Sequence, residues 1–172
     1  MRRPELARER FERMYREHAS ALYAYLRWSC GDDTLAEDLL ADVFERVLRS
    51  AHRYDPRRGS ETTWLYAIAV NRVRDHARRR AAERRAVLQL RAEAERAPVG
   101  SPTVESAVAA RDEVATALAQ MSDAEREVIA LRFSSDLTMD QVAQALGEPR
   151  STVEGRLYRA LRTLREKLRD DQ

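Results

Sequence analysis

Hydrophobic side chains recur at three- and four-residue spacing along most of the chain, which is the period of an amphipathic helix and not of a strand. Residues 5–28 and 34–50 both show this spacing, and the stretch "SCGDD" separates them. The pattern predicts two amphipathic helices. In the second, we expect a buried stripe made of Leu35, Leu39, Leu40, Val43, Phe44, Val47 and Leu48.

A third helix is predicted from about Thr62 to Arg80 or beyond, and its character changes along its length. It is apolar almost all round as far as Val70 and strongly basic after that residue. We therefore expect its beginning to lie in a core and its end to carry cations outward. One stripe along it, by helical spacing, contains Trp64, Ala67, Asn71, Arg74 and Arg78.

The second half of the chain predicts shorter helices, of which the first covers about 103–119. Further along, Ala143, Gly147 and Val153 stand four and six residues apart, which is the spacing of a helix-turn-helix. The small residue lets the two helices approach, the glycine takes the turn, and the apolar residue anchors the second helix. Pro149 cannot continue the first of the two helices.

Helix starts are marked by capping boxes, in which a Ser or Thr is followed three residues later by Glu or Gln. We expect each such cap to stabilise its helix by about 1 kcal/mol. The predicted boxes are Thr34 with Glu37, Ser122 with Glu125, Thr138 with Gln141, and Ser151 with Glu154.

The composition is typical of an all-α protein, because 172 residues contain only five Gly and five Pro and the β-branched residues are scattered. The stretch "RAEAERAPVGSPTVES" interrupts the helical pattern with two Pro, one Gly and no apolar period. We therefore predict two small helical domains, residues 5–90 and 103–169, joined by a linker over 91–102. The second domain contains the helix-turn-helix.

Charge is unevenly distributed, although the net charge is only +2. Residues 71–86 carry seven Arg and two acids, residues 150–169 carry seven bases and two acids, and residues 101–140 carry eight acids and three Arg. Two basic segments on either side of an acidic one indicate two separate contacts with a polyanion, and for each alone a solvated helix face is an equal alternative.

Catalysis, metal binding and membrane insertion are not expected. Cys30 is the single cysteine and His18, His52 and His76 are far apart, so neither a nucleophile–base set nor a zinc site can be assembled. We predict no cofactor and no small-molecule substrate. Because no run is apolar enough to cross a bilayer and the N-terminus lacks a signal-peptide core, we expect a cytoplasmic protein.

Four stretches, "AEDLLADVFERVLR", "TTWLYAIAVNRVRDHARRR", "REVIALRF" and "TMDQVAQALGEPRSTVEGRLYRAL", occur in this order. Together they resemble the extracytoplasmic-function (ECF) sigma factors, the minimal promoter-recognition subunits of bacterial RNA polymerase in the sigma-70 family. The resemblance covers nearly all of residues 11–168. The chain departs from the family at Ala41, where Gln is usual, at Met121 and Ser122, where Leu-Pro is usual, and at Glu154, where a base is common.

The resemblance implies a non-enzymatic factor that binds core RNA polymerase and directs it to promoter DNA. The first domain would bind the polymerase and recognise and melt the −10 element, while the second would read the −35 element. An anti-sigma factor is expected to control the protein.

The resemblance also assigns roles to individual side chains. Those expected to bind the polymerase are Asp38, Asp42, Glu45, Arg46 and Arg49. Those expected at the −10 element are Trp64 and Asn71 on unpaired bases and Arg74, Arg78 and Arg79 on phosphates, beside a loop around 54–59 that would take a flipped base. Those expected at the −35 element are Arg150, Ser151, Thr152, Gly155, Arg156 and Arg159.

Glu154 is an acid at the front of a helix that is expected to meet phosphates. By helical periodicity it lies roughly 70° from the centre of the buried stripe, lateral to the face that would enter the groove. One hypothesis is that it caps the helix with Ser151. The other is that it accepts a hydrogen bond from a cytosine amino group.

Two alternative functions remain open on the residues alone. A stand-alone helix-turn-helix regulator would carry a dimerisation or ligand domain in its first half, where this chain has a basic signature instead. A non-transcribing all-α interaction module is compatible with the same charge distribution.

Overall fold

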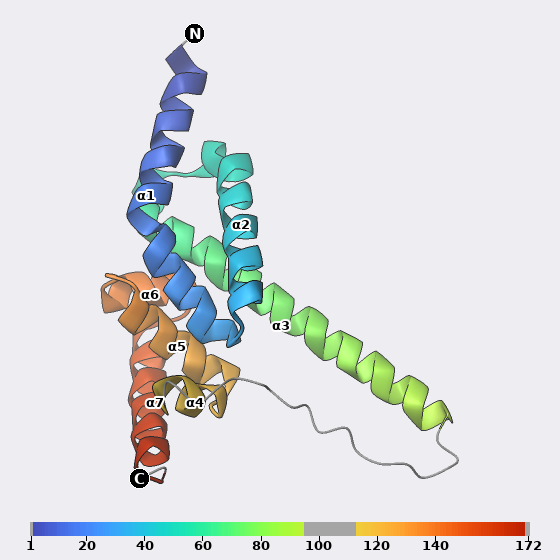
Figure 1. Ribbon diagram of the computed structural model, residues 1–172. Coiled ribbons are helices and arrows are strands. Elements are labelled where there is room, and N and C mark those ends of the chain that lie inside the picture. The colour runs from blue at the N-terminus through green and yellow to red at the C-terminus, as the bar shows by residue number, and fades with distance from the viewer. Residues whose placement is uncertain (1, 95–112, 171–172) are drawn as a thin grey trace.

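The structure, a computed structural model, describes residues 2–94 and 113–170. Every regular element in these ranges is a helix, which confirms the all-α prediction (Figure 1). Part of the predicted linker and the predicted helix over 103–112 lie outside the described residues.

Three long helices make up the first half. They are α1 (Arg2–Cys30), α2 (Asp33–Ser50) and α3 (Glu61–Ala94), and two short 3-10 helices, η1 (Ala51–Arg53) and η2 (Pro56–Arg58), connect α2 to α3. The far end of α3 extends away from the other helices (Figure 1). Because α3 runs to Ala94, residues 91–94 are helical, whereas the sequence predicted linker there.

Four helices make up the second half: α4 (Glu113–Ala119), α5 (Asp123–Ser134), α6 (Met139–Leu146) and α7 (Arg150–Asp170). The capping boxes of Ser122 on α5 and Thr138 on α6 are both present, with each side chain accepting from the backbone N–H three residues on. These two local predictions are confirmed.

The predicted cap at Thr34 is wrong, because α2 begins at Asp33. Gly31 follows the end of α1 and has a left-handed φ of 70°. Asp32 is extended, and its carboxylate accepts a hydrogen bond from the Leu35 N–H at 2.8 Å. A charged carboxylate one residue before the helix is an efficient acceptor for these unpaired N–H groups. Thr34 therefore lies inside the first turn.

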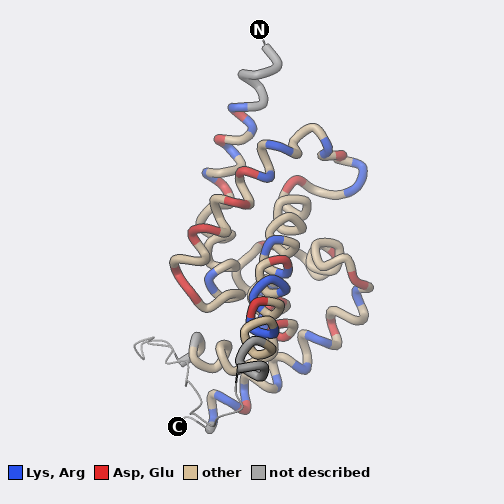
Figure 2. The backbone as a smooth tube through the Cα atoms, turned by 90° about the vertical axis from the view of Figure 1, so that its right-hand side faces the viewer, with Lys and Arg blue, Asp and Glu red and all other residues tan. Residues whose placement is uncertain are grey.

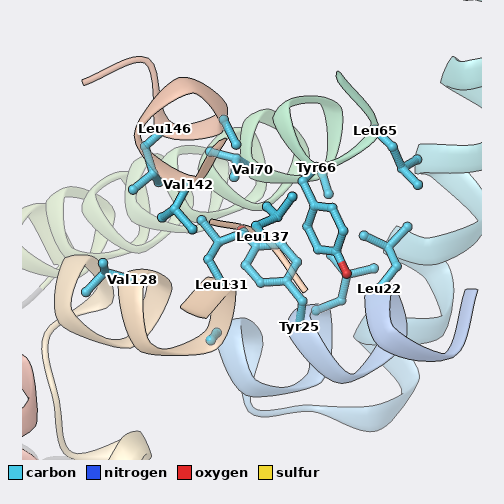
Figure 3. Close-up of a cluster of buried hydrophobic side chains, with 14 of the residues drawn as sticks. Leu22, Tyr25, Leu65, Tyr66, Val70, Val128, Leu131, Leu137, Val142 and Leu146 are labelled. Carbon is cyan, nitrogen blue, oxygen red and sulfur yellow. The ribbon is translucent and has the colours of Figure 1, made fainter. Parts of the chain in front are cut away.

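The core is continuous across the two halves. Helix α1 packs against α5, and α3 packs against α6. Figure 3 shows side chains from both halves meeting in one cluster. From the first half come Leu22, Tyr25, Tyr66 and Val70, and from the second half Leu131, Leu137, Val142 and Leu146.

The buried stripe of α2 is confirmed at its centre and not over its whole length, since Leu35 and Leu40 are only half-buried. Leu39, Val43, Phe44 and Val47 are buried, but Leu48 is 55% exposed. It borders a shallow apolar groove that is also lined by Phe11, Met14 and Trp64.

Candidate functional site

Helices α6 and α7 form the predicted helix-turn-helix. Helix α6 ends at Gly147, whose φ of 68° and ψ of 30° are left-handed. The Glu148 N–H then donates to the Ala143 carbonyl at 3.0 Å, closing the turn. A Cβ on Gly147 would meet no atom within 4 Å, so it is the backbone conformation that requires glycine here.

One face of α7 is anchored in the core and the opposite face is open. Val153 and Ala160 are fully buried. Thr152 and Arg159 are exposed on the other side of the helix, with Gly155 half-buried between them. A Cβ on Gly155 would lie 3.8 Å from the Arg159 guanidinium, which is ordinary contact. The structure therefore places these three predicted residues together on one surface.

Tyr158 lies on the same open face and was missed by the sequence reasoning. Its side chain is 73% exposed. It stands three residues after Gly155 and seven after Ser151, so helical spacing places it with these two residues. The available signal was an aromatic residue that falls outside the apolar stripe of α7.

Glu154 pairs with Arg150 and does not cap the helix. Helix α7 begins at Arg150, and the Pro149 carbonyl accepts from the N–H groups of Thr152 and Val153. The Arg150 Nε donates to Glu154 at 2.7 Å, and its Nη1 donates to both carboxylate oxygens of Asp140 at 3.0 Å. Hydrogen bonds to Glu154 and then to Asp140 raise the pKa of the Arg150 guanidinium. The predicted capping box of Ser151 and Glu154 is wrong.

The five side chains predicted to contact the polymerase are all exposed on α2. Two of them are paired with each other, since Arg49 donates to Glu45 at 2.5 Å. Asp42 accepts from Arg72 of α3 at 3.0 Å. For Asp38 and Arg46, no ion-pair partner is found in the described part of the chain. Helix α2 thus presents a charged face of both signs to solvent.

The residues predicted for the −10 element are not all on one surface. Asn71, Arg78 and Arg79 are exposed on α3, and Arg78 forms an ion pair with Asp75. Trp64 is half-buried, and its ring centroid lies 5.5 Å from that of Tyr54 in the loop before α3. The stripe predicted from spacing is therefore split between a packed start and an open end.

Arg74 faces the second half of the molecule. Its Nε and Nη2 donate to the two oxygens of Glu127 at 2.9 and 2.8 Å, and its Nη1 donates to the Leu146 carbonyl at 3.2 Å. Glu127 is only 8% exposed. A forked pair of this kind fixes both the position and the orientation of the guanidinium. In this arrangement Arg74 binds protein groups.

Arg156 of α7 belongs to the same set of contacts. It donates to both oxygens of Glu148, at 3.1 and 2.5 Å, and Arg74 also donates to Glu148 at 3.3 Å. Hydrogen bonds from Arg156, followed by the charge of Arg74, lower the pKa of the Glu148 carboxyl. We call Arg74, Glu127, Glu148 and Arg156 the Arg74 network. It contains one residue predicted for each DNA element.

Helix α6 also holds the loop before α3. Gln144 donates to the Arg58 carbonyl, and Gln141 donates to the Ser60 hydroxyl at 3.3 Å. Gly59, at a φ of 148°, is so close that a Cβ there would lie 2.8 Å from the Gln144 amide nitrogen. The loop predicted to take a flipped base is thus covered by the first helix of the helix-turn-helix.

Lys and Arg positions recur along α7 and along the projecting end of α3, in keeping with the charge segments of the sequence (Figure 2). In the described ranges, no group of three or more His, Cys, Asp or Glu is arranged to hold a metal ion. No helix within those ranges is long and apolar enough to span a bilayer.

Comparison with known proteins gives two family matches in chain order. The model of Sigma-70 region 2 matches residues 14–83, and the model of Sigma-70, region 4 matches residues 117–166. The solved structure of the sigma factor RpoE from Bartonella quintana, in complex with the anti-sigma factor NepR, aligns with a TM-score of 0.73 at 22% identity. It covers 95% of this chain and 99% of that one, so the two share a fold.

Curated relatives extend the match over most of the chain. The ECF RNA polymerase sigma factor BldN of Streptomyces coelicolor is 29% identical over 164 residues, which are 94% of this chain and 61% of BldN. The ECF RNA polymerase sigma factor RpoE of Cereibacter sphaeroides is 30% identical over 158 residues, which are 91% of this chain and 84% of that protein. On the strength of this identity and of the two region matches, the chain belongs to the ECF RNA polymerase sigma factors of the sigma-70 family.

Proposed function

We propose that this protein binds core RNA polymerase and directs it to specific promoters. The observation that carries the proposal is the helix-turn-helix of α6 and α7, whose second helix turns Thr152, Gly155 and Arg159 away from the core. Membership of the ECF sigma factors supports it. The contribution of the chain is recognition, and the catalytic chemistry belongs to the polymerase.

The open face of α7 reads the −35 element. Arg159 contacts a base edge or a phosphate, and Gly155 lets the helix backbone approach the groove. Tyr158 adds an aromatic contact beside them. The remaining predicted residues, Arg150, Ser151, Thr152 and Arg156, surround this centre at the N-terminal end and flank of the helix.

The first half supplies the polymerase contact and the −10 contact. The exposed charged face of α2, with Asp38, Asp42, Glu45, Arg46 and Arg49, binds the polymerase. Asn71 faces the melted strand, and Arg78 and Arg79 hold phosphates. We assign residues 5–90 to this part and 103–169 to the −35 part, with the junction at the end of α3.

The two halves separate when the protein engages the polymerase and DNA. The Arg74 network uses Arg74 and Arg156, and α6 covers the loop around Gly59. These groups cannot bind DNA while they bind each other. The closed arrangement is therefore the state of the free protein, and the contacts that it loses on opening are replaced by contacts with polymerase and promoter.

An anti-sigma factor is the expected regulator. The structural neighbour from Bartonella quintana is a sigma factor in complex with the anti-sigma factor NepR. We propose a partner of the same kind for this chain, one that binds the faces used for polymerase or DNA. Because promoter DNA and RNA polymerase are in the bacterial cytoplasm, we propose that this chain acts there.

The polymerase contact is tested by reversing charge on α2. We expect the double variant Asp38→Arg and Asp42→Arg to lose co-purification with core RNA polymerase. Circular dichroism should stay unchanged and the melting temperature should fall only slightly, because the lost Asp42–Arg72 ion pair is largely solvent-exposed. Glu17→Arg, an exposed acid of α1, is the matched control and should bind normally. Equal co-purification of the double variant and the wild type would refute the assignment.

Run-off transcription separates the alternative functions. A stand-alone regulator binds its DNA site tightly without polymerase, and an interaction module supports no transcript. We expect weak DNA binding by the chain alone and promoter-specific transcripts after addition of core polymerase.

A further inference from the structure

A cavity of about 470 Å³ lies where the two halves of the molecule meet. Helix α3 lines one side of it, while α5, the turn after α6 and the start of α7 line the other. The ends of α1 and α2 that face each other complete the wall. A cavity of this size is within the range of roughly 300–1,000 Å³ in which small-molecule ligands bind.

The wall contains five arginines and three carboxylates, and each carboxylate is already engaged by an arginine. Asp123 pairs with Arg126 at 2.7 Å. Glu127 and Glu148 belong to the Arg74 network, at 2.8 Å from Arg74 and 2.5 Å from Arg156. The negative charge of the wall is therefore neutralised from within.

Two cations of the wall remain uncompensated. Arg80 and Arg84 stand one turn apart on α3, both are exposed, and neither has an ion-pair partner in the ranges 2–94 and 113–170. Like charges four residues apart on a helix repel each other. An anion placed between the two guanidinium groups would relieve this repulsion and accept their forked hydrogen bonds.

We infer that this cavity binds a small polyphosphate anion of nucleotide size, with its phosphates on Arg80 and Arg84. Two adjacent guanidinium groups favour a di- or triphosphate over a single negative charge. The volume exceeds what a bare diphosphate needs, and this favours a nucleoside di- or triphosphate as the occupant. In this proposal the ligand is an effector held by the arginines of the wall.

A ligand here contacts both halves at once and therefore stabilises the closed arrangement. By linkage, a molecule that binds one of two states shifts the population toward that state. If opening is required for polymerase binding, the ligand opposes that binding. This consequence rests on the proposed function, whereas the binding site itself does not.

The site is tested by isothermal titration calorimetry on the full chain, without polymerase or DNA, using ATP, GTP, inorganic diphosphate and inorganic phosphate as probes. We expect a nucleoside triphosphate to bind, and Arg84→Ala to weaken its Kd at least tenfold. Arg85→Ala is the matched control, since Arg85 is exposed on the same helix but does not line the cavity. Its Kd should stay within twofold of the wild type.

Each of the following results either supports the proposed binding site or overturns it. Diphosphate that binds as tightly as the nucleotides supports the phosphate site and makes the inorganic anion its occupant. Equal weakening by Arg84→Ala and Arg85→Ala overturns the proposal, because it indicates diffuse attraction to a basic helix. Absence of binding at millimolar concentrations overturns it as well.

Hydrogen–deuterium exchange supplies the second readout. A ligand inside the cavity should protect residues 76–84 of α3 and residues 123–127 of α5 together. Protection confined to α3 would mean that the anion lies on the helix surface, which contradicts a site between the halves. If the chain binds the nucleotide at both walls but supports no transcription, the proposed function is refuted and the proposed binding site is still supported.

Discussion

At the scale of single residues, Glu154 shows what spacing can and cannot predict. Ser151 stands three residues before it, so the sequence favours a capping box. The structure instead pairs Glu154 with Arg150, because α7 begins at Arg150, two residues before the Thr152 start that the box requires. The pair neutralises the acid, so Glu154 at the front of the helix is compatible with DNA binding through the neighbouring residues.

Gly155→Ala should separate folding from DNA recognition. Alanine is favoured over glycine within a helix by about 1 kcal/mol, and the new Cβ meets only ordinary contact with Arg159. We therefore expect chemical denaturation to show a free energy of unfolding raised by up to about 1 kcal/mol. Binding of holoenzyme to its promoter should weaken, since the methyl group holds the helix away from the groove. Undiminished promoter binding would remove Gly155 from the contact face.

Arg159→Ala should lower −35-dependent transcription, with Arg165→Ala, an exposed arginine further along the same helix, as the control. Loss of a bidentate base contact costs about 1–3 kcal/mol and relaxes specificity, whereas loss of a phosphate contact lowers the salt slope of binding by about one unit. Footprinting at several salt concentrations distinguishes the two. A footprint identical to that of the wild type contradicts both roles.

At the scale of elements, the sequence predicted two of the helix caps correctly, but it did not predict which of two neighbouring capping residues begins α2. The boxes at Ser122 and Thr138 are both present. At α2, Asp32 precedes Thr34 and takes the role. The linker was predicted to begin at residue 91, whereas α3 continues to Ala94. The first helix-breaking residue of this stretch is Pro98, so residues 91–94 contain no signal that ends a helix.

Gly147→Ala should destabilise the second half without touching any neighbour. No atom lies within 4 Å of the added Cβ, so the cost comes from the left-handed φ of 68°, at about 1–2 kcal/mol. Gly147→Asn should cost less, because Asn tolerates this conformation. Thermal unfolding monitored by circular dichroism gives the comparison, and equal melting temperatures for all three proteins would contradict the turn geometry.

At the scale of the whole molecule, the closed arrangement could not be predicted from the sequence. The acids that bind Arg74 stand 53 and 74 residues away along the chain, and no local pattern connects them. The sequence placed Arg74 with Arg78 on a DNA-binding stripe, but it could not show that packing of the halves brings Arg74 to Glu127. The helices and the helix-turn-helix are local features, whereas the joining of the halves is a tertiary one.

Acid should loosen the closed arrangement. Arg156 and Arg74 hold the pKa of Glu148 below its ordinary value of 4.5. A carboxyl whose pKa is lowered by folding contributes stability above the unfolded pKa and loses it as pH falls through the folded pKa. We therefore expect the contribution of Glu148 to be complete near pH 6 and to disappear progressively below about pH 4.5.

Small-angle scattering across this pH range measures the effect as an increase in the radius of gyration. Glu148→Gln, which cannot titrate, should be more open at pH 6 and should change less on acidification. A wild-type radius that changes no more than that of the variant would show that Glu148 does not link the halves.

The most direct test of the central claim is run-off transcription with core RNA polymerase purified from the same organism, on templates with randomised −35 and −10 positions. We predict that transcripts appear only when this chain is added and that sequencing them recovers two preferred elements. The Asp38→Arg and Asp42→Arg double variant should abolish all transcripts, and Arg159→Ala should relax the −35 element alone. Absence of promoter-specific transcripts from a folded wild-type chain that binds the polymerase would contradict the account.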